Sequence, residues 1–73
     1  MALRPIQSVP SRNIASVEWD DETLDLVVTF RSGYVYRYDQ VPEDVAEGFR
    51  TALSASDYLK IYVADATTYS RIL

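Results

Sequence analysis

Hydrophobic and polar residues alternate with a period of two through the first half of the chain. Three segments show this pattern and are rich in β-branched and aromatic side chains: residues 13–19, 23–30 and 34–39. Such a period is typical of strands that bury one face. Acidic residues separate the first two segments, and Arg31-Ser32-Gly33 separates the second from the third. The sequence therefore predicts a three-stranded antiparallel β-meander.

The second turn fixes the register of the last two strands. A three-residue loop over residues 31–33 needs a left-handed backbone only at Gly33, whereas a two-residue loop would also force Ser32 to positive φ. The three-residue loop gives these opposed pairs: Phe30–Tyr34, Val28–Tyr36 and Leu26–Tyr38. The tyrosines then share a face with the apolar residues of the middle strand, and this face is the predicted core.

The first turn is predicted to pair Trp19 with Leu24 across the acidic residues, which brings Val17 opposite Leu26. The same register pairs Ile14 with Thr29. Residues on the other side of the predicted sheet then include a small apolar patch: Ile14, Val27 and Val35. A patch of this kind needs a cover, from the N-terminal segment or from a partner.

A helix is predicted to begin at Pro42, because proline suits the first turn of a helix. An apolar stripe with helical spacing extends this prediction to about Leu53. The stripe is Val45, Phe49, Ala52 and Leu53. Ser54 or Ser56 is a suitable N-cap for a second helix. Periodicity leaves residues 58–63 open between helix and strand, because Leu59, Ile61 and Val63 alternate as in a strand.

The two ends of the chain have no sustained period. Residues 1–10 contain two prolines and isolated apolar side chains, so they are predicted to form an extended arm before a single domain at residues 11–73. A chain of 73 residues has room for one hydrophobic core. The apolar residues near the C-terminus, Tyr69, Ile72 and Leu73, are predicted to close it.

The amino-acid composition excludes several kinds of catalytic and metal site. The chain has no cysteine and no histidine, which excludes disulfides, the usual zinc sites and thiol or imidazole catalysis. It shows neither a Gly-rich phosphate loop nor a Ser-x-x-Lys pair, so we expect no enzyme, cofactor or metal. Its acidic cluster matches no calcium loop and is interpreted as a solvated hairpin tip. No signal-peptide pattern or membrane span is visible, which predicts a soluble cytoplasmic domain without membrane contact.

Three short motifs, taken in order, resemble the KTSC family, which is named after the C-terminal domain of certain lysyl-tRNA synthetases and also occurs as free-standing bacterial and phage proteins. The motifs are Ser11…Ile14, Phe30-x-x-Gly33-x-x-Tyr36-x-Tyr38-x-x-Val41-Pro42 and Ala52-x-Ser54-x-x-x-Tyr58. The resemblance covers residues 11–73. It implies an α+β fold in which the three-stranded meander is followed by two helical segments packed on one face, and so a helix over residues 58–64.

Three positions depart from the family pattern. Ser56 stands where relatives usually have glycine, and Ile61 and Tyr62 are apolar where relatives tend to be polar. The family's role is not established, although its attachment to a tRNA synthetase suggests RNA binding. The resemblance therefore implies a fold and carries over no catalytic residue.

Function is predicted as a small non-enzymatic interaction module that binds a protein partner or a second copy of itself. A net charge of -4 disfavours nucleic acid and fits a protein partner better. The candidate partner surface is Ile14, Val27, Val35, Ile61 and Tyr62. The alternative is an RNA-associated module, with contacts from Arg12, Arg31, Arg37, Tyr36 and Tyr38. A weaker alternative is an acidic phage-type decoy or inhibitor that occupies the nucleic-acid-binding site of another protein.

Overall fold

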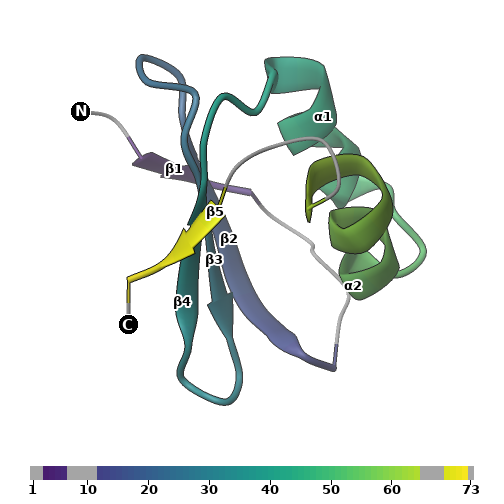
Figure 1. The fold of residues 1–73 in the computed structure, drawn as a ribbon. Coiled ribbons are helices and arrows are strands. Elements are labelled where there is room, and N and C mark those ends of the chain that lie inside the picture. Colours follow the sequence, from purple (N-terminus) through teal and green to yellow (C-terminus); the bar gives the residue numbers. More distant parts are fainter. Residues whose placement is uncertain (1–2, 7–11, 65–68, 73) are drawn as a thin grey trace.

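A five-stranded antiparallel sheet with helical segments on one face makes up the fold (Figure 1). The computed structural model describes residues 3–6, 12–64 and 69–72. The strands are β1 (Leu3–Pro5), β2 (Ile14–Asp20), β3 (Leu26–Phe30), β4 (Val35–Tyr38) and β5 (Tyr69–Arg71), which neighbour one another in chain order. The helical segments are α1 (Glu43–Glu47), the 3₁₀ turn η1 (Gly48–Arg50), α2 (Ala55–Tyr58) and the π-helical η2 (Leu59–Ala64).

The predicted α+β class and the central β2-β3-β4 meander are confirmed, but the sheet has two more strands than the sequence predicted. Part of the predicted arm forms β1, which pairs with β2. The Ile6 amide donates to the Val17 carbonyl over 2.8 Å, and hydrogen-bonded residues alternate along an antiparallel pair. The nitrogen of Pro5 therefore faces away from β2, the orientation in which a strand tolerates proline. The rest of the arm, residues 1–2 and 7–10, lies outside the described residues.

The predicted register between β3 and β4 is confirmed. Val28 pairs with Tyr36 and Leu26 pairs with Tyr38. Gly33 has a φ of +102°, in the left-handed region that the three-residue loop requires of it.

The predicted register between β2 and β3 is wrong by two residues, because Trp19 pairs with Leu26 rather than Leu24. The Asp20 carboxylate accepts hydrogen bonds from the amides of Glu22 (2.8 Å) and Thr23 (3.3 Å) and closes a tight turn. Leu24 has a φ of +63° and leaves the ladder. Asp20 is buried rather than solvated, so this part of the acidic cluster has a structural role.

Ile14 lies in the core and not on the outer side of the sheet, which corrects the predicted patch. The register shifts between Ile14 and Ser16, and Ile14 pairs with Phe30. This bulge adds one residue to β2 and turns Ile14 toward the helical side. Its side chain is 1% exposed.

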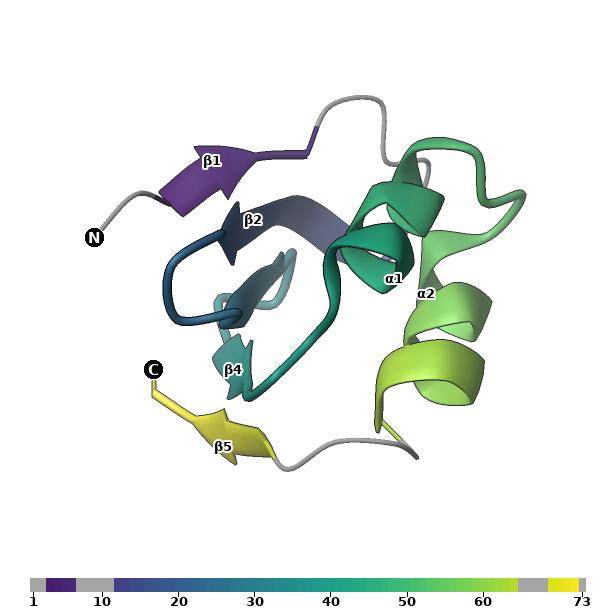
Figure 2. The same cartoon turned by 90° about the horizontal axis from the view of Figure 1, so that it is seen from above.

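The core fills the space between the sheet and the helical layer, which covers one face of the sheet (Figure 2). Tyr38 is buried and Tyr36 is half-buried, so the predicted orientation of these tyrosines toward the core is confirmed. The buried hydrophobic residues are Ile6, Ile14, Val17, Trp19, Leu26, Val28, Tyr38, Val41, Ala46, Phe49, Ala55, Leu59 and Val63.

The first helix is shorter than its apolar stripe predicted. It tightens into the 3₁₀ turn η1 at Gly48 and ends at Thr51, whose φ is −112°. Leu53 lies two residues beyond this end, so it no longer follows Phe49 on the buried side of the helix. Phe49 is fully buried, whereas Leu53 is 100% exposed.

Residues 58–64 are helical, as the family resemblance implied, and do not form the strand that the alternation of apolar residues suggested. Ser54 caps it, since its hydroxyl accepts from the Asp57 amide over 3.4 Å. Leu59 and Val63 are four residues apart and both buried, and Ile61 between them is exposed. Near the C-terminus, Ile72 is exposed and does not close the core, and Leu73 lies outside the described residues.

Candidate functional site

The face of the sheet turned away from the helices, called the outer face below, has no layer of secondary structure over it in the described parts of the chain (Figure 2). One row across β2, β3 and β4 consists of Glu18, Val27 and Arg37. The next row consists of Ser16, Thr29 and Val35. Val27 and Val35 lie on this outer face, as the sequence predicted, and both are half-buried.

The residue directly after β5 extends the outer face by one apolar side chain that sequence reasoning did not place there. The Ile72 amide donates to the Val35 carbonyl over 2.8 Å, which sets these two residues opposite one another. Opposed side chains point to the same face, and Ile72 is 53% exposed. Ile72 therefore replaces Ile14 as the third apolar member of the patch. The three-residue strand β5 is too short to show a period, so no pattern in the sequence placed Ile72 on this face.

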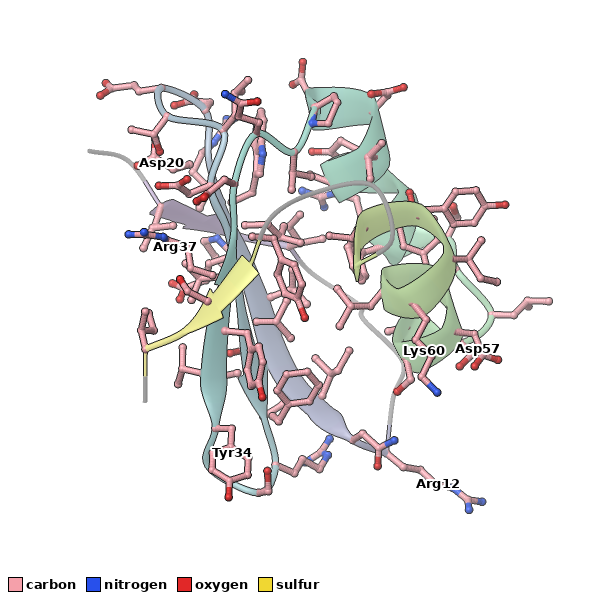
Figure 3. The ribbon with its side chains drawn as sticks, in the orientation of Figure 1. Arg12, Asp20, Tyr34, Arg37, Asp57 and Lys60 are labelled. Atoms are coloured by element: carbon pink, nitrogen blue, oxygen red, sulfur yellow. The ribbon has the colours of Figure 1, made fainter. Side chains whose placement is uncertain are left out.

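Opposite charges flank Val27 on the outer face. Glu18 lies on its β2 side and Arg37 on its β4 side. Arg37 extends from the side of the sheet away from the helices (Figure 3), and its Nε lies 3.5 Å from an Asp39 carboxylate oxygen. Both members of this ion pair are about half exposed, so solvent screens it and leaves the guanidinium able to contact a partner.

Ile61 and Tyr62, the remaining predicted partner residues, are exposed on η2. They lie in the helical layer, on the opposite side of the molecule from the outer face. The Tyr62 ring packs against Tyr58 with centroids 4.8 Å apart, and Tyr58 packs edge-on against Phe49 at 4.6 Å. The structure thus divides the predicted partner surface into two separate regions.

Tyr58 also donates a hydrogen bond from its hydroxyl to the Val45 carbonyl over 2.6 Å. Burial raises the pKa of Tyr58 above its ordinary value of 10.0, with further contributions from Asp44 and Tyr62. The folded state therefore holds the phenol proton more tightly than the unfolded state does.

We expect this phenol to contribute stability that is fully present below about pH 10 and is lost as the pH rises through the raised pKa of the folded state. Urea unfolding below and above that pH measures the loss. The variant Tyr58→Phe should be less stable near neutral pH but should lose less stability on the alkaline side. Equal alkaline losses in Tyr58→Phe and wild type would assign the effect to other groups, and Tyr34→Phe at the exposed hairpin provides the control.

The predicted RNA contacts do not converge on one surface. Tyr38 is 4% exposed and stacks against the half-buried Tyr36 on the core side of the sheet, so the Tyr38 ring offers no open face to a base. Arg37 lies on the outer face. Arg12 lies just before β2, at the same end of the sheet as the hairpin tip that carries Tyr34, but the two side chains are well apart (Figure 3). Arg31 lies there too, since its amide donates to the carbonyl of Asn13 over 2.8 Å.

The acidic residues of the hairpin between β2 and β3 are held by contacts within the protein. Asp25 accepts from the Thr23 hydroxyl over 3.0 Å, and Asp21 lies 3.2 Å from the Arg4 guanidinium. Among the described residues, no group of three or more carboxylates is arranged to hold a metal ion. The cluster stabilises the hairpin turn, as the buried Asp20 shows most clearly.

The described residues define a small α+β domain, and comparisons with known proteins agree with this fold. The KTSC domain family model matches residues 10–69, and the chain belongs to this family. A crystal structure of a KTSC domain protein from Yersinia pestis has a TM-score of 0.84 and is 27% identical, with 99% of this chain and 100% of that chain covered. No curated protein matches the sequence. None of the helices in the described part is long and apolar enough to cross a membrane.

Proposed function

We propose that this domain is a non-enzymatic interaction module of the cytoplasm whose protein partner is a second copy of the chain, bound through the outer face. One observation carries the proposal: Glu18 and Arg37 flank Val27 in one row of a sheet face that no helix of the described residues covers. The lack of cysteine fits a reducing compartment.

A two-fold axis parallel to β3 makes this row complementary to itself. The axis brings two outer faces together and exchanges the strands on either side of β3, so that β2 of one copy lies over β4 of the other. Glu18 then faces Arg37 of the second copy, Arg37 faces Glu18, and the two Val27 side chains meet at the axis. An axis perpendicular to the strands would instead oppose two Glu18 carboxylates. Charge complementarity therefore selects both the partner and its orientation.

The expected association is weak. Stable interfaces bury about 800 Å² on each partner, and the outer face offers less, because strands lie about 4.8 Å apart and the edge strands have three residues each. Burial of the apolar surface of Val27, Val35 and Ile72 is the main driving force for association. Each Å² of apolar surface removed from water contributes roughly 25 cal/mol. Exposed ion pairs add about 0–1 kcal/mol each. We expect a dissociation constant in the micromolar range or weaker.

The RNA-associated alternative has one supporting observation, the adjacent Arg12 and Arg31 at the hairpin end of the sheet. Phosphate binding needs grouped cations, and stacking needs an open aromatic face. Two arginines are few cations for phosphate binding, and the buried Tyr38 has no open ring face for stacking. The outer face, with its apolar and oppositely charged side chains, is better suited to a protein partner. The acidic decoy has still less support, because its carboxylates are engaged in the hairpin.

Sedimentation velocity over a range of protein concentrations tests the proposal. Wild type should associate reversibly, and Val27→Asp should remain a folded monomer, because it places two carboxylates against each other at the axis. Ile61→Asp is the matched control, since it adds the same charge to an exposed residue of η2. Association lost in Ile61→Asp and kept in Val27→Asp would move the contact to the helical layer. A monomeric wild type at millimolar concentration would contradict the proposal.

A further inference from the structure

A small cleft opens between β1 and the first helical segment, on the side of the sheet opposite the outer face. Its volume is about 140 Å³. The cleft is lined by Arg4, Pro5, Ile6, Trp19, Glu47 and Arg50. An apolar cavity of about 150 Å³ holds a benzene molecule, so the space suits a body the size of one ring.

The inner wall of the cleft is apolar and fixed in position. Trp19 and Ile6 are both buried in the core. The Trp19 indole N–H donates to the Val41 carbonyl over 2.9 Å, which holds the ring in one orientation. Its polar atom is thus satisfied, and the ring offers the cleft an apolar surface.

Two guanidinium groups stand at the rim. The Arg4 guanidinium lies 5.9 Å from the centroid of the Trp19 ring, a cation–π distance, and its Nη2 lies 3.2 Å from Asp21. The Nε of Arg50 donates to Glu47 over 2.5 Å. A guanidinium has five N–H donors in a planar fork, so each arginine keeps donors beyond these contacts.

We propose that this cleft binds a carboxylate that carries a ring-sized apolar body. The body lies against Trp19 and Ile6, and the carboxylate accepts hydrogen bonds from Arg4 and Arg50, the geometry that arginine forks recognise best. Glu47 competes for Arg50. Because both members of that pair are nearly half exposed, their interaction is worth about 0–1 kcal/mol, and a ligand carboxylate can displace it. The proposal is independent of self-association.

Titration with benzoate tests this inference in the full chain, and the single tryptophan reports from the cleft itself. We expect a saturable change in Trp19 fluorescence and in the NMR signal of its indole N–H. Arg50→Gln should weaken benzoate binding about tenfold. Glu47→Gln should tighten it, because the competing carboxylate is removed. Arg12→Gln is the control, since it removes an exposed arginine outside the cleft and should change nothing.

Neutral benzamide should bind more weakly than benzoate. A peptide that ends in phenylalanine distinguishes the two sources of such a ligand. Tighter binding of its free acid than of benzoate would assign the cleft to a protein C-terminus, and weaker binding would assign it to a free small acid. No saturable change with benzoate or the peptide acid, equal binding of benzamide, or weaker benzoate binding in Glu47→Gln would overturn the proposal.

Discussion

Phe49→Ala is expected to destabilise the domain by about 3–5 kcal/mol, the usual cost when a buried aromatic residue is truncated. Phe49 is fully buried where the first helical segment meets the sheet, and its ring packs edge-on against Tyr58. Small domains have a free energy of unfolding of about 5–15 kcal/mol, so this variant should lose a large part of it. Urea unfolding followed by circular dichroism measures the change.

Leu53→Ala is the matched control, because the sequence placed Leu53 in the same apolar stripe as Phe49. Leu53 is 100% exposed, so its truncation should change stability by less than about 0.5 kcal/mol. A large loss in Leu53→Ala would show that the first helix continues past Thr51 and buries the whole stripe. Equal effects of the two variants would contradict the 3₁₀ turn η1.

Gly48→Ala is expected to destabilise the domain by about 2–4 kcal/mol, although alanine is normally the better helix former. A Cβ atom at this position would clash with the Tyr58 hydroxyl oxygen and lie 2.6 Å from the ring carbon that bears it. The Tyr58 ring would have to move, and the hydrogen bond to the Val45 carbonyl would be lost. Stability from thermal and urea unfolding measures the cost.

The double variant Gly48→Ala with Tyr58→Ala separates this contact from a general effect on the helix. Removal of the ring frees the space that the new methyl group needs. Gly48→Ala should therefore cost several kcal/mol in wild type and little in the Tyr58→Ala background. Equal costs in both backgrounds would show that the glycine is required for another reason.

The central meander could be predicted from the sequence because two strong signals agree there. The period of two assigns the faces of β3 and β4, and Gly33 fixes the register between them. Alternation specifies which face is buried but not how many residues a turn contains, which is why the β2–β3 register was wrong by two. The Asp20 turn that sets this register depends on side-chain hydrogen bonds that leave no periodic pattern.

The edges of the sheet and the full outer face could not be predicted for related reasons. β1 and β5 have three residues each, too few to show a period, and β1 contains a proline that argues against a strand. One bulge moved Ile14 from the outer face into the core. Val27 and Arg37 could be placed correctly because they lie in the well-specified meander.

Charge reversal at Glu18 and Arg37 tests the central claim, self-association about an axis parallel to β3, most directly. The dimer dissociation constant would be measured by sedimentation for Glu18→Arg, Arg37→Glu and the double variant. Each single reversal places like charges opposite one another, so we expect each to weaken the dimer about tenfold. The double variant restores opposite charges and should recover association close to wild type. A double variant that is no tighter than either single variant would contradict this account of the outer face.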